Sequence, residues 1–197
     1  MSSEVSTDGD EKYQLIVAKA ILAGETGVGK TSIRRSYFGE NFKEDHMSTL
    51  GADFSVKRIP HSNSTILEFQ IWDLAGQMSF NPLRKRFFIG ASALFLIFDI
   101  TDRKSFEELD GWFDDFWDSF DNRKDIPMTL IGNKDDLQDQ KVTDEEMEEF
   151  WKRTKKKYPD ISGKTHIIKT SAKTGEHIED AFSFMSEALL ELFSEEA

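Results

Sequence analysis

Three glycines and a lysine are grouped in the segment GETGVGKT, residues 24–31. The segment fits the pattern G-x-x-x-x-G-K-[ST], follows an apolar run and precedes the helical pattern SIRRSYF. In this context the glycines allow a tight turn whose backbone N–H groups face phosphate oxygens, and the next helix adds its positive end. Lys30 can then reach the β- and γ-phosphates of a nucleotide, and the Thr31 hydroxyl can bind Mg²⁺. The segment predicts bound phosphate but does not choose the base.

Two later segments favour guanine. GNKDD (132–136) contains N-K-x-D, and TSAK (170–173) follows the strand-like run THIIK. The carboxylate of Asp136 can accept from guanine N1–H and the exocyclic amine, a donor pair that adenine lacks, and TSAK can present backbone N–H groups to guanine O6. Each segment alone has an ordinary alternative, with Asn133 and Asp136 as turn residues and Ser171 as the cap of the last helix. Their order and their places at strand ends favour the guanine site.

Short apolar runs and amphipathic segments must position these residues. The run 65–73 alternates as a strand does, whereas 93–99 and 128–134 are continuously apolar, as is typical of strands covered on both faces. Helical stripes of apolar residues occupy 103–121 and 178–192. Strands that alternate with helices predict one α/β domain with a mostly parallel sheet. We interpret the aromatic stripe of 103–121 as core packing.

The overall composition indicates a folded, acidic protein. The 197 residues are 38% hydrophobic, and the formal net charge is −12. This charge disfavours nucleic acid and anionic membranes as partners, and we interpret KRTKKK (152–157) as a solvated helix end. The lack of cysteine excludes disulfides, thiolate metal sites and cysteine nucleophiles. We expect a cytoplasmic protein with a flexible acidic tail over 1–12 and one domain over 13–197.

Five segments together resemble the small Ras-like GTPases, and within them the Rab branch. GETGVGKT, STLGADF, WDLAGQ, GNKDD and TSAK occur in the family's order and at about its spacing, over residues 14–194. The resemblance implies a GTPase domain (G domain) with a six-stranded, mostly parallel sheet and helices on both faces. It also implies a molecular switch that binds GTP, hydrolyses it to GDP and phosphate with Mg²⁺, and changes two loops as it does so.

The resemblance assigns a role to each matching residue. Thr49 would bind Mg²⁺ and the γ-phosphate, Asp73 would hold Mg²⁺ through water, and Gln77 would position the attacking water. The expected catalytic residues are Gln77, Lys30 and Thr49. The expected phosphate-binding residues are Gly24, Thr26, Gly27, Val28, Gly29, Lys30, Thr31, Ser32 and Gly76. The expected guanine-binding residues are Phe42, Asn133, Lys134, Asp136, Ser171, Ala172 and Lys173. The expected metal ligands are Thr31, Thr49 and, through water, Asp73.

The resemblance also implies partners. Phe54, Trp72 and Phe87 match an aromatic triad that Rab-like proteins show to effectors, although the three side chains could simply cover the sheet edge. No arginine lies between residues 39 and 50, so we expect slow intrinsic hydrolysis that an activating protein accelerates. An exchange factor is the third expected partner. Without a cysteine for prenylation we expect no stable membrane anchor, membrane association only through partners, and a monomer.

Two alternatives to a hydrolysing switch remain at this stage. One is a scaffold that binds guanine nucleotides without hydrolysing them, which the presence of both Gln77 and Thr49 disfavours. The other is an ATP-using P-loop kinase, which N-K-x-D disfavours. A dinucleotide-binding site is also disfavoured because G-x-G-x-x-G is absent.

Overall fold

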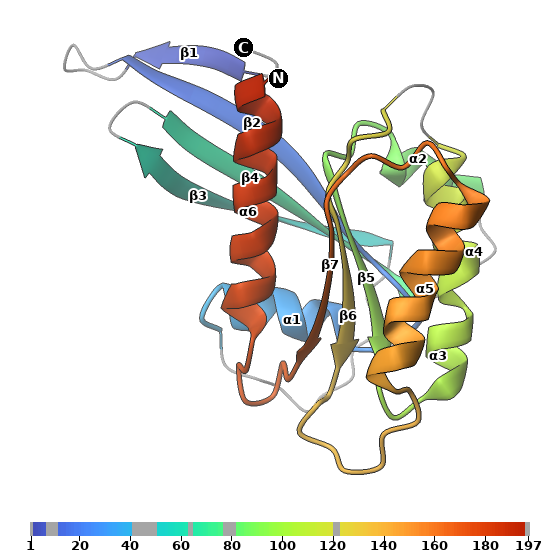
Figure 1. Ribbon diagram of the computed structural model, residues 1–197. Helices are drawn as coiled ribbons and strands as arrows, with labels where there is room; N and C mark the ends of the chain where they lie inside the picture. Colours follow the sequence, from blue (N-terminus) through green and yellow to red (C-terminus); the bar gives the residue numbers. More distant parts are fainter. Residues whose placement is uncertain are drawn as a thin grey trace.

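A central β-sheet with helices on both faces organises the computed structural model (Figure 1). The structure describes residues 2–6, 12–40, 51–62, 65–76, 82–119 and 123–195. The strands are β1 (Ser2–Ser6), β2 (Lys12–Ala23), β3 (Ala52–Ser62), β4 (Thr65–Leu74), β5 (Ala93–Asp99), β6 (Met128–Asn133) and β7 (Thr165–Thr170). The helices are α1 (Lys30–Tyr37), α2 (Pro82–Phe88), α3 (Arg103–Glu107), α4 (Leu109–Trp117), α5 (Asp144–Lys157) and α6 (Ile178–Glu195).

The six strands that the resemblance implies are present in the order β3-β4-β2-β5-β6-β7. Of these six, β4, β2, β5, β6 and β7 are parallel, and β3 runs antiparallel to β4. The prediction of a mostly parallel sheet is therefore confirmed. Because the parallel strands share one direction, their carboxyl ends meet along one edge of the sheet, at the bottom of Figure 1.

Residues 2–6, within the segment that we expect to be a flexible tail, form a seventh strand. Strand β1 pairs antiparallel with the start of β2, from Ser2 opposite Ile16 to Ser6 opposite Lys12. The sequence between the two strands contains Asp8-Gly9, a dipeptide that favours hairpin turns. The expectation of a tail rests on the acidic, Ser-rich composition of this stretch, and composition does not report strand pairing.

The helices bury two separate apolar layers against the sheet. Helices α1 and α6 cover one face, and α2, α3, α4 and α5 cover the other (Figure 1). The predicted aromatic stripe is confirmed as core packing, since Phe106, Phe113 and Phe116 are at most 3% exposed. It forms two helices, α3 and α4, rather than one. Helical hydrogen bonds nevertheless continue through the turn at Glu108, from Glu108 N to Lys104 O and from Trp112 N to Glu108 O.

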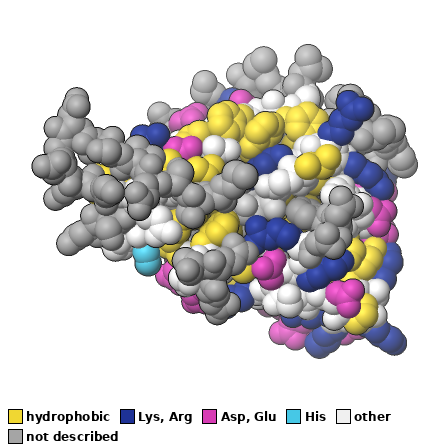
Figure 2. All heavy atoms as spheres, turned by 90° about the horizontal axis from the view of Figure 1, so that it is seen from above, with side chains coloured by type: hydrophobic (Ala, Val, Ile, Leu, Met, Phe, Trp, Pro, Cys, Tyr) yellow, Lys and Arg dark blue, Asp and Glu magenta, His cyan; other side chains and the backbone are white. Residues whose placement is uncertain are grey.

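Charged side chains of both signs lie on the surface of this acidic protein. On the face shown in Figure 2, acidic and basic side chains are interspersed among the coloured residues. The basic end of α5 carries both solvated and paired residues, because Arg153 and Lys157 form ion pairs with Asp110 and Asp114 of α4. In the part of the chain that the structure describes, no helix is long and apolar enough to cross a membrane.

Candidate functional site

The predicted site residues gather at the carboxyl edge of the sheet. The loop 24–29 follows β2, Asp73 lies near the end of β4, and Asp99 and Asn133 end β5 and β6. The strand order reverses at β2, which lies between β4 and β5. Ligands of open α/β sheets bind beyond the carboxyl ends of strands at such a reversal. The fold therefore places these residues where a ligand is expected.

The glycines of the phosphate loop are required by backbone geometry. Gly24, Gly27 and Gly29 have φ angles of 143°, 81° and 101°, a region that favours glycine. A Cβ at Gly24 would lie 2.0 Å from the carbonyl oxygen of Ile97, and one at Gly29 would lie 2.2 Å from Asn133 Nδ2. The loop can take this close-packed turn only with glycine at these positions.

Lys30 begins helix α1 and is enclosed by the loop. Its Nζ donates to the carbonyl oxygens of Gly24 and Glu25, both at 2.7 Å, and the residue is 5% exposed. Burial lowers the pKa of Lys30 to about 8, although the charges of Asp73 and Glu25 oppose this shift. The N-cap residue Gly29 provides no side-chain cap, so the positive end of α1 is available to an anion.

Thr31 and Asp73 form an oxygen-rich pair beside Lys30. Thr31 Oγ1 donates to Asp73 Oδ2 at 2.5 Å, and Asp73 is fully buried. Burial raises the pKa of Asp73, while the Thr31 hydrogen bond and the charges of Lys30 and Arg34 act in the opposite direction. Asp73 Oδ1 is buried and has no hydrogen-bond partner among the described residues.

Asn133 joins the phosphate loop to the TSAK segment. Its Nδ2 donates to the carbonyl oxygen of Val28 at 2.8 Å, and its Oδ1 accepts from Thr170 Oγ1 and from the backbone N–H of Ala172, at 3.2 and 3.1 Å. The side chain is 1% exposed. Asn133, at the end of β6, therefore joins the phosphate loop that follows β2 to the end of β7.

The other residues of N-K-x-D also make contacts between loops. Asp136 is exposed, and its Oδ1 accepts from Ser171 Oγ at 2.6 Å. Lys134 Nζ donates to Asp99 Oδ2 at 2.5 Å. Burial alone would raise the pKa of Asp99, but hydrogen bonds from Lys134 and Thr101 outweigh it and lower that pKa.

The alternative role of Ser171 as cap of the last helix is wrong, because α6 begins only at Ile178. Ser171 Oγ instead accepts from the backbone N–H of Thr174 at 3.2 Å and stabilises the turn that follows β7. Lys173 lies exposed in the same turn.

The structure brings most, but not all, of the predicted residues together. Thr26 and Gly27 are exposed on the phosphate loop, Val28 is buried beneath it, and Ser32 is half-buried on α1. Gly76 packs against the loop, since a Cβ there would lie 2.1 Å from Thr26 N. The predicted residues that lie outside the described residues are Phe42, Thr49 and Gln77.

The predicted aromatic triad forms one cluster across β3, β4 and α2. The ring centroids of Phe54 and Trp72 are 5.3 Å apart, and those of Trp72 and Phe87 are 6.2 Å apart. Phe54 is 48% exposed, whereas Trp72 and Phe87 are half-buried and pack against the core. The geometry is compatible with both a docking surface and a cover over the sheet edge.

Two further residues, Glu25 in the phosphate loop and Trp112 beside it, are not among the predicted site residues. Glu25 accepts a hydrogen bond at 2.9 Å from the indole N–H of Trp112 on α4. Trp112 lies within residues 103–121, whose aromatic stripe the sequence assigns to core packing, and nothing in the sequence links it to a residue 87 positions away. Its spacing within the aromatic stripe reports burial but not what the indole N–H contacts.

This combination of fold and loops defines the class of Ras-like G domains. The Ras family model matches residues 19–191, and the chain belongs to the Ras family of small GTPases.

Individual relatives place the chain near Rab7-type GTPases. It is 35% identical to the Ypt/Rab-type GTPase ypt7 of Schizosaccharomyces pombe, over 93% of this chain and 85% of that protein. It is 35% identical to the Ras-related protein Rab7 of Drosophila melanogaster, over 90% of this chain and 82% of that protein. It is 33% identical to the Ras-related protein Rab-7a of Dictyostelium discoideum, over 90% of this chain and 84% of that protein.

Proposed function

We propose that the protein is a nucleotide switch that binds GTP, hydrolyses it to GDP and phosphate, and engages effectors in its GTP form. The observation that carries this proposal is the position of Asn133, which connects the phosphate loop with the two predicted guanine-binding segments. Phosphate and base would then be held by one rigid set of strand ends. The exposed carboxylate of Asp136 is the group that selects guanine.

The residues beside Lys30 fit Mg²⁺. This ion prefers oxygen ligands, takes few of them from protein and keeps several waters. Thr31 Oγ1 and the buried carboxylate of Asp73, whose Oδ1 has no hydrogen-bond partner among the described residues, supply such oxygens. The described residues hold no cluster of three or more His, Cys, Asp or Glu, so this pair is compared with an ion that takes few ligands from protein. With Thr49 they would hold the ion, which would offset the charge that develops on the phosphates.

In this proposal the chain contributes positioning and charge rather than a nucleophile. Lys30 would exchange its hydrogen bonds with the Gly24 and Glu25 carbonyls for phosphate oxygens. Backbone N–H groups of the loop and the start of α1 would bind further phosphate oxygens. Gln77 would orient the attacking water. A scaffold that binds but does not hydrolyse GTP is the remaining alternative.

The relatives support a role in membrane trafficking through protein partners. Two of the relatives are named Ypt/Rab-type GTPase ypt7 and Ras-related protein Rab7. The aromatic cluster of Phe54, Trp72 and Phe87 offers an effector a contiguous apolar surface. We assign effector binding to this cluster, and hydrolysis stimulated by an activating protein to the phosphate site.

Substitution of Asp136 tests the base assignment. Asp136→Ala removes the carboxylate that would accept from guanine, so we expect the affinity for GDP to fall by at least about tenfold, about 1.4 kcal/mol. Asp139→Ala is the matched control, because it removes the same charge from an exposed site in the same loop. Displacement of bound GDP by ATP as readily as by GTP would contradict the guanine site.

Phosphate release separates the switch from the scaffold. The wild-type protein with Mg²⁺ should convert bound GTP to GDP, and Gln77→Leu should retain GTP after the same incubation. Retention of GTP by the wild-type protein, alone and with candidate activating proteins, would favour the scaffold.

A further inference from the structure

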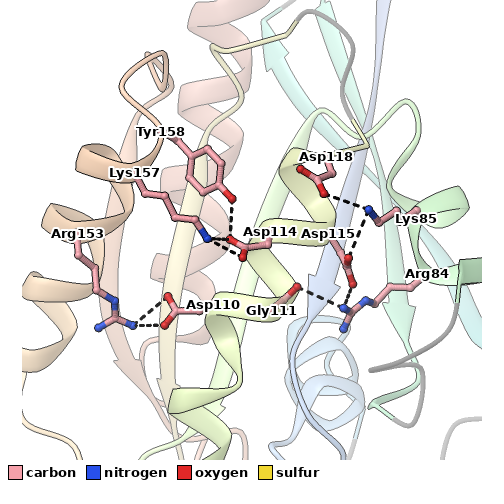
Figure 3. A network of polar contacts seen from close by, with 10 residues as sticks. All are labelled: Arg84, Lys85, Asp110, Gly111, Asp114, Asp115, Asp118, Arg153, Lys157 and Tyr158. Atoms are coloured by element: carbon pink, nitrogen blue, oxygen red, sulfur yellow. Dashed lines mark hydrogen bonds and ion pairs between the residues drawn. The ribbon is translucent and has the colours of Figure 1, made fainter.

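Helix α2 places a buried cation between the aromatic core and helix α4. Arg84 is only 3% exposed, whereas Lys85 and Arg86 on the same helix are exposed. The Arg84 guanidinium forms an ion pair with Asp115 and donates to the carbonyl oxygen of Gly111 at 3.3 Å (Figure 3). Arginine is rarely buried unless it is paired, so the fold holds this side chain at a defined place.

Trp112 connects Arg84 to the phosphate loop. The guanidinium carbon of Arg84 lies 4.2 Å from the centroid of the Trp112 ring, a distance typical of cation–π contact. The indole N–H of Trp112, itself 1% exposed, donates to Glu25 Oε1 at 2.9 Å. The carbonyl oxygen of Glu25 accepts from Lys30 Nζ at 2.7 Å. A continuous set of contacts therefore runs from α2 to the lysine of the phosphate loop.

The charges along this path depend on one another. Burial lowers the pKa of Arg84, and the negative charge of Glu25 opposes that shift. Glu25 also opposes the lowered pKa of Lys30. The Glu25 carboxylate would repel phosphate, so a neighbouring cation that offsets its charge favours phosphate binding.

We propose that Arg84 is a positioning residue for the phosphate loop, holding Trp112 and Glu25 so that phosphate affinity depends on the place of helix α2. This inference rests on the proposed nucleotide site. Helix α2 follows two predicted site residues in the sequence. Gly76 is expected to bind phosphate, and Gln77 is expected to position the attacking water. A movement of α2 would therefore change the loop that binds the nucleotide, and bound nucleotide would in turn favour one place of α2.

Dissociation of nucleotide measures this dependence. With Arg84→Met we expect a non-hydrolysable GTP analogue to leave about fivefold faster, and GDP to leave less than about twofold faster, because the triphosphate carries more charge. Arg86→Met is the control, since it removes the same charge from an exposed position of the same helix. It should leave both rates unchanged. An Arg84→Met protein that keeps the wild-type rates would overturn the proposal.

A purely structural anchor would behave differently. If Arg84 only fastens α2 to α4 through Asp115, Arg84→Met should lower the melting temperature and change both dissociation rates by the same factor. Equal factors would overturn the proposal. If the wild-type protein binds neither nucleotide, the proposed function itself fails, and that result is distinct from normal binding with no effect of Arg84.

The loop side of the path gives an independent test. Glu25→Gln can still accept from Trp112 but lacks the negative charge, so in that background Arg84→Met should change the analogue's dissociation by less than about twofold. An unreduced effect there would show that Arg84 does not act through Glu25. If Arg84→Met does not fold, Trp112→Phe replaces it. Because that variant lacks the indole donor, it should release the analogue about fivefold faster. An unchanged rate would contradict the proposal.

Discussion

At the scale of single residues, Lys30 ties nucleotide binding to pH. Burial lowers the pKa of Lys30 to about 8, and bound phosphate would raise this pKa because it favours the ammonium. A group that is protonated on binding contributes fully below its free pKa and progressively less above it. We therefore expect GDP affinity to change little below about pH 7.5 and to fall about fourfold between pH 7 and pH 8.5.

Calorimetry in buffers of different ionisation enthalpy checks this expectation. Binding of GDP at pH 8.5 should take up about three quarters of a proton, and binding at pH 7 about a tenth. Release of protons at pH 8.5, or no exchange at either pH, would contradict the lowered pKa of Lys30.

The sequence predicts some residues of the site better than others. Lys30, Thr31, Asn133 and Asp136 lie in contiguous motifs whose spacing already specifies their chemistry. Trp112 could not be found in this way, because an amphipathic stripe reports that a tryptophan is buried but not which partner its N–H reaches. Such contacts arise when the fold brings separate segments together.

At the scale of elements, helix α4 lies between the basic helix α2 and the basic carboxyl-terminal end of α5. Figure 3 shows Lys85 of α2 directed at Asp118, Arg153 and Lys157 of α5 directed at Asp110 and Asp114, and Tyr158, the residue after α5, directed at Asp114. Most of these side chains are solvent-exposed, so each pair contributes little to stability alone. Together these pairs connect α2 and α5 to α4. The proposed path to the phosphate loop depends on how α2 lies against α4.

The start of helix α5 provides a direct test of local stability. Thr143 and Glu146 form a capping box, in which Thr143 Oγ1 accepts from Glu146 N and Glu146 Oε2 accepts from Thr143 N. Thr143→Ala should lower the free energy of unfolding by about 1 kcal/mol, measured by urea denaturation. Thr143→Ser keeps the hydroxyl and should restore most of the loss. An equal loss in both variants would show that the hydroxyl is not the cause.

Periodicity predicts elements well where the pattern is long. The alternating run 65–73 and the apolar stripe 178–192 are confirmed as β4 and α6, with Leu67, Phe69 and Ile71 fully buried. Element boundaries are less predictable, as the break between α3 and α4 at Glu108 shows. A local turn inside an amphipathic stripe leaves the period of apolar residues almost unchanged.

At the scale of the whole molecule, the two ends of the sheet differ in their role. The carboxyl ends of the parallel strands carry the candidate site, whereas β1 pairs with the start of β2, from residue 12 to residue 16. The Gly24 turn lies at the opposite end of β2. Strand β1 therefore lies outside the part of the sheet that positions the phosphate loop, and residues 1–11 can be removed to separate fold from function.

Deletion of residues 1–11 should leave nucleotide binding intact. The ladder between β1 and β2 holds five residue pairs, and the gain from its hydrogen bonds is largely offset by the entropy lost when the five residues of β1 are ordered. We therefore expect the free energy of unfolding to change by less than about 1 kcal/mol and GDP affinity to stay within about twofold. Deletion of residues 193–197 is the control, because it removes the buried Phe193 and should cost about 2–4 kcal/mol. A large loss of GDP affinity on removal of β1 alone would mean that this strand supports the site through the length of β2.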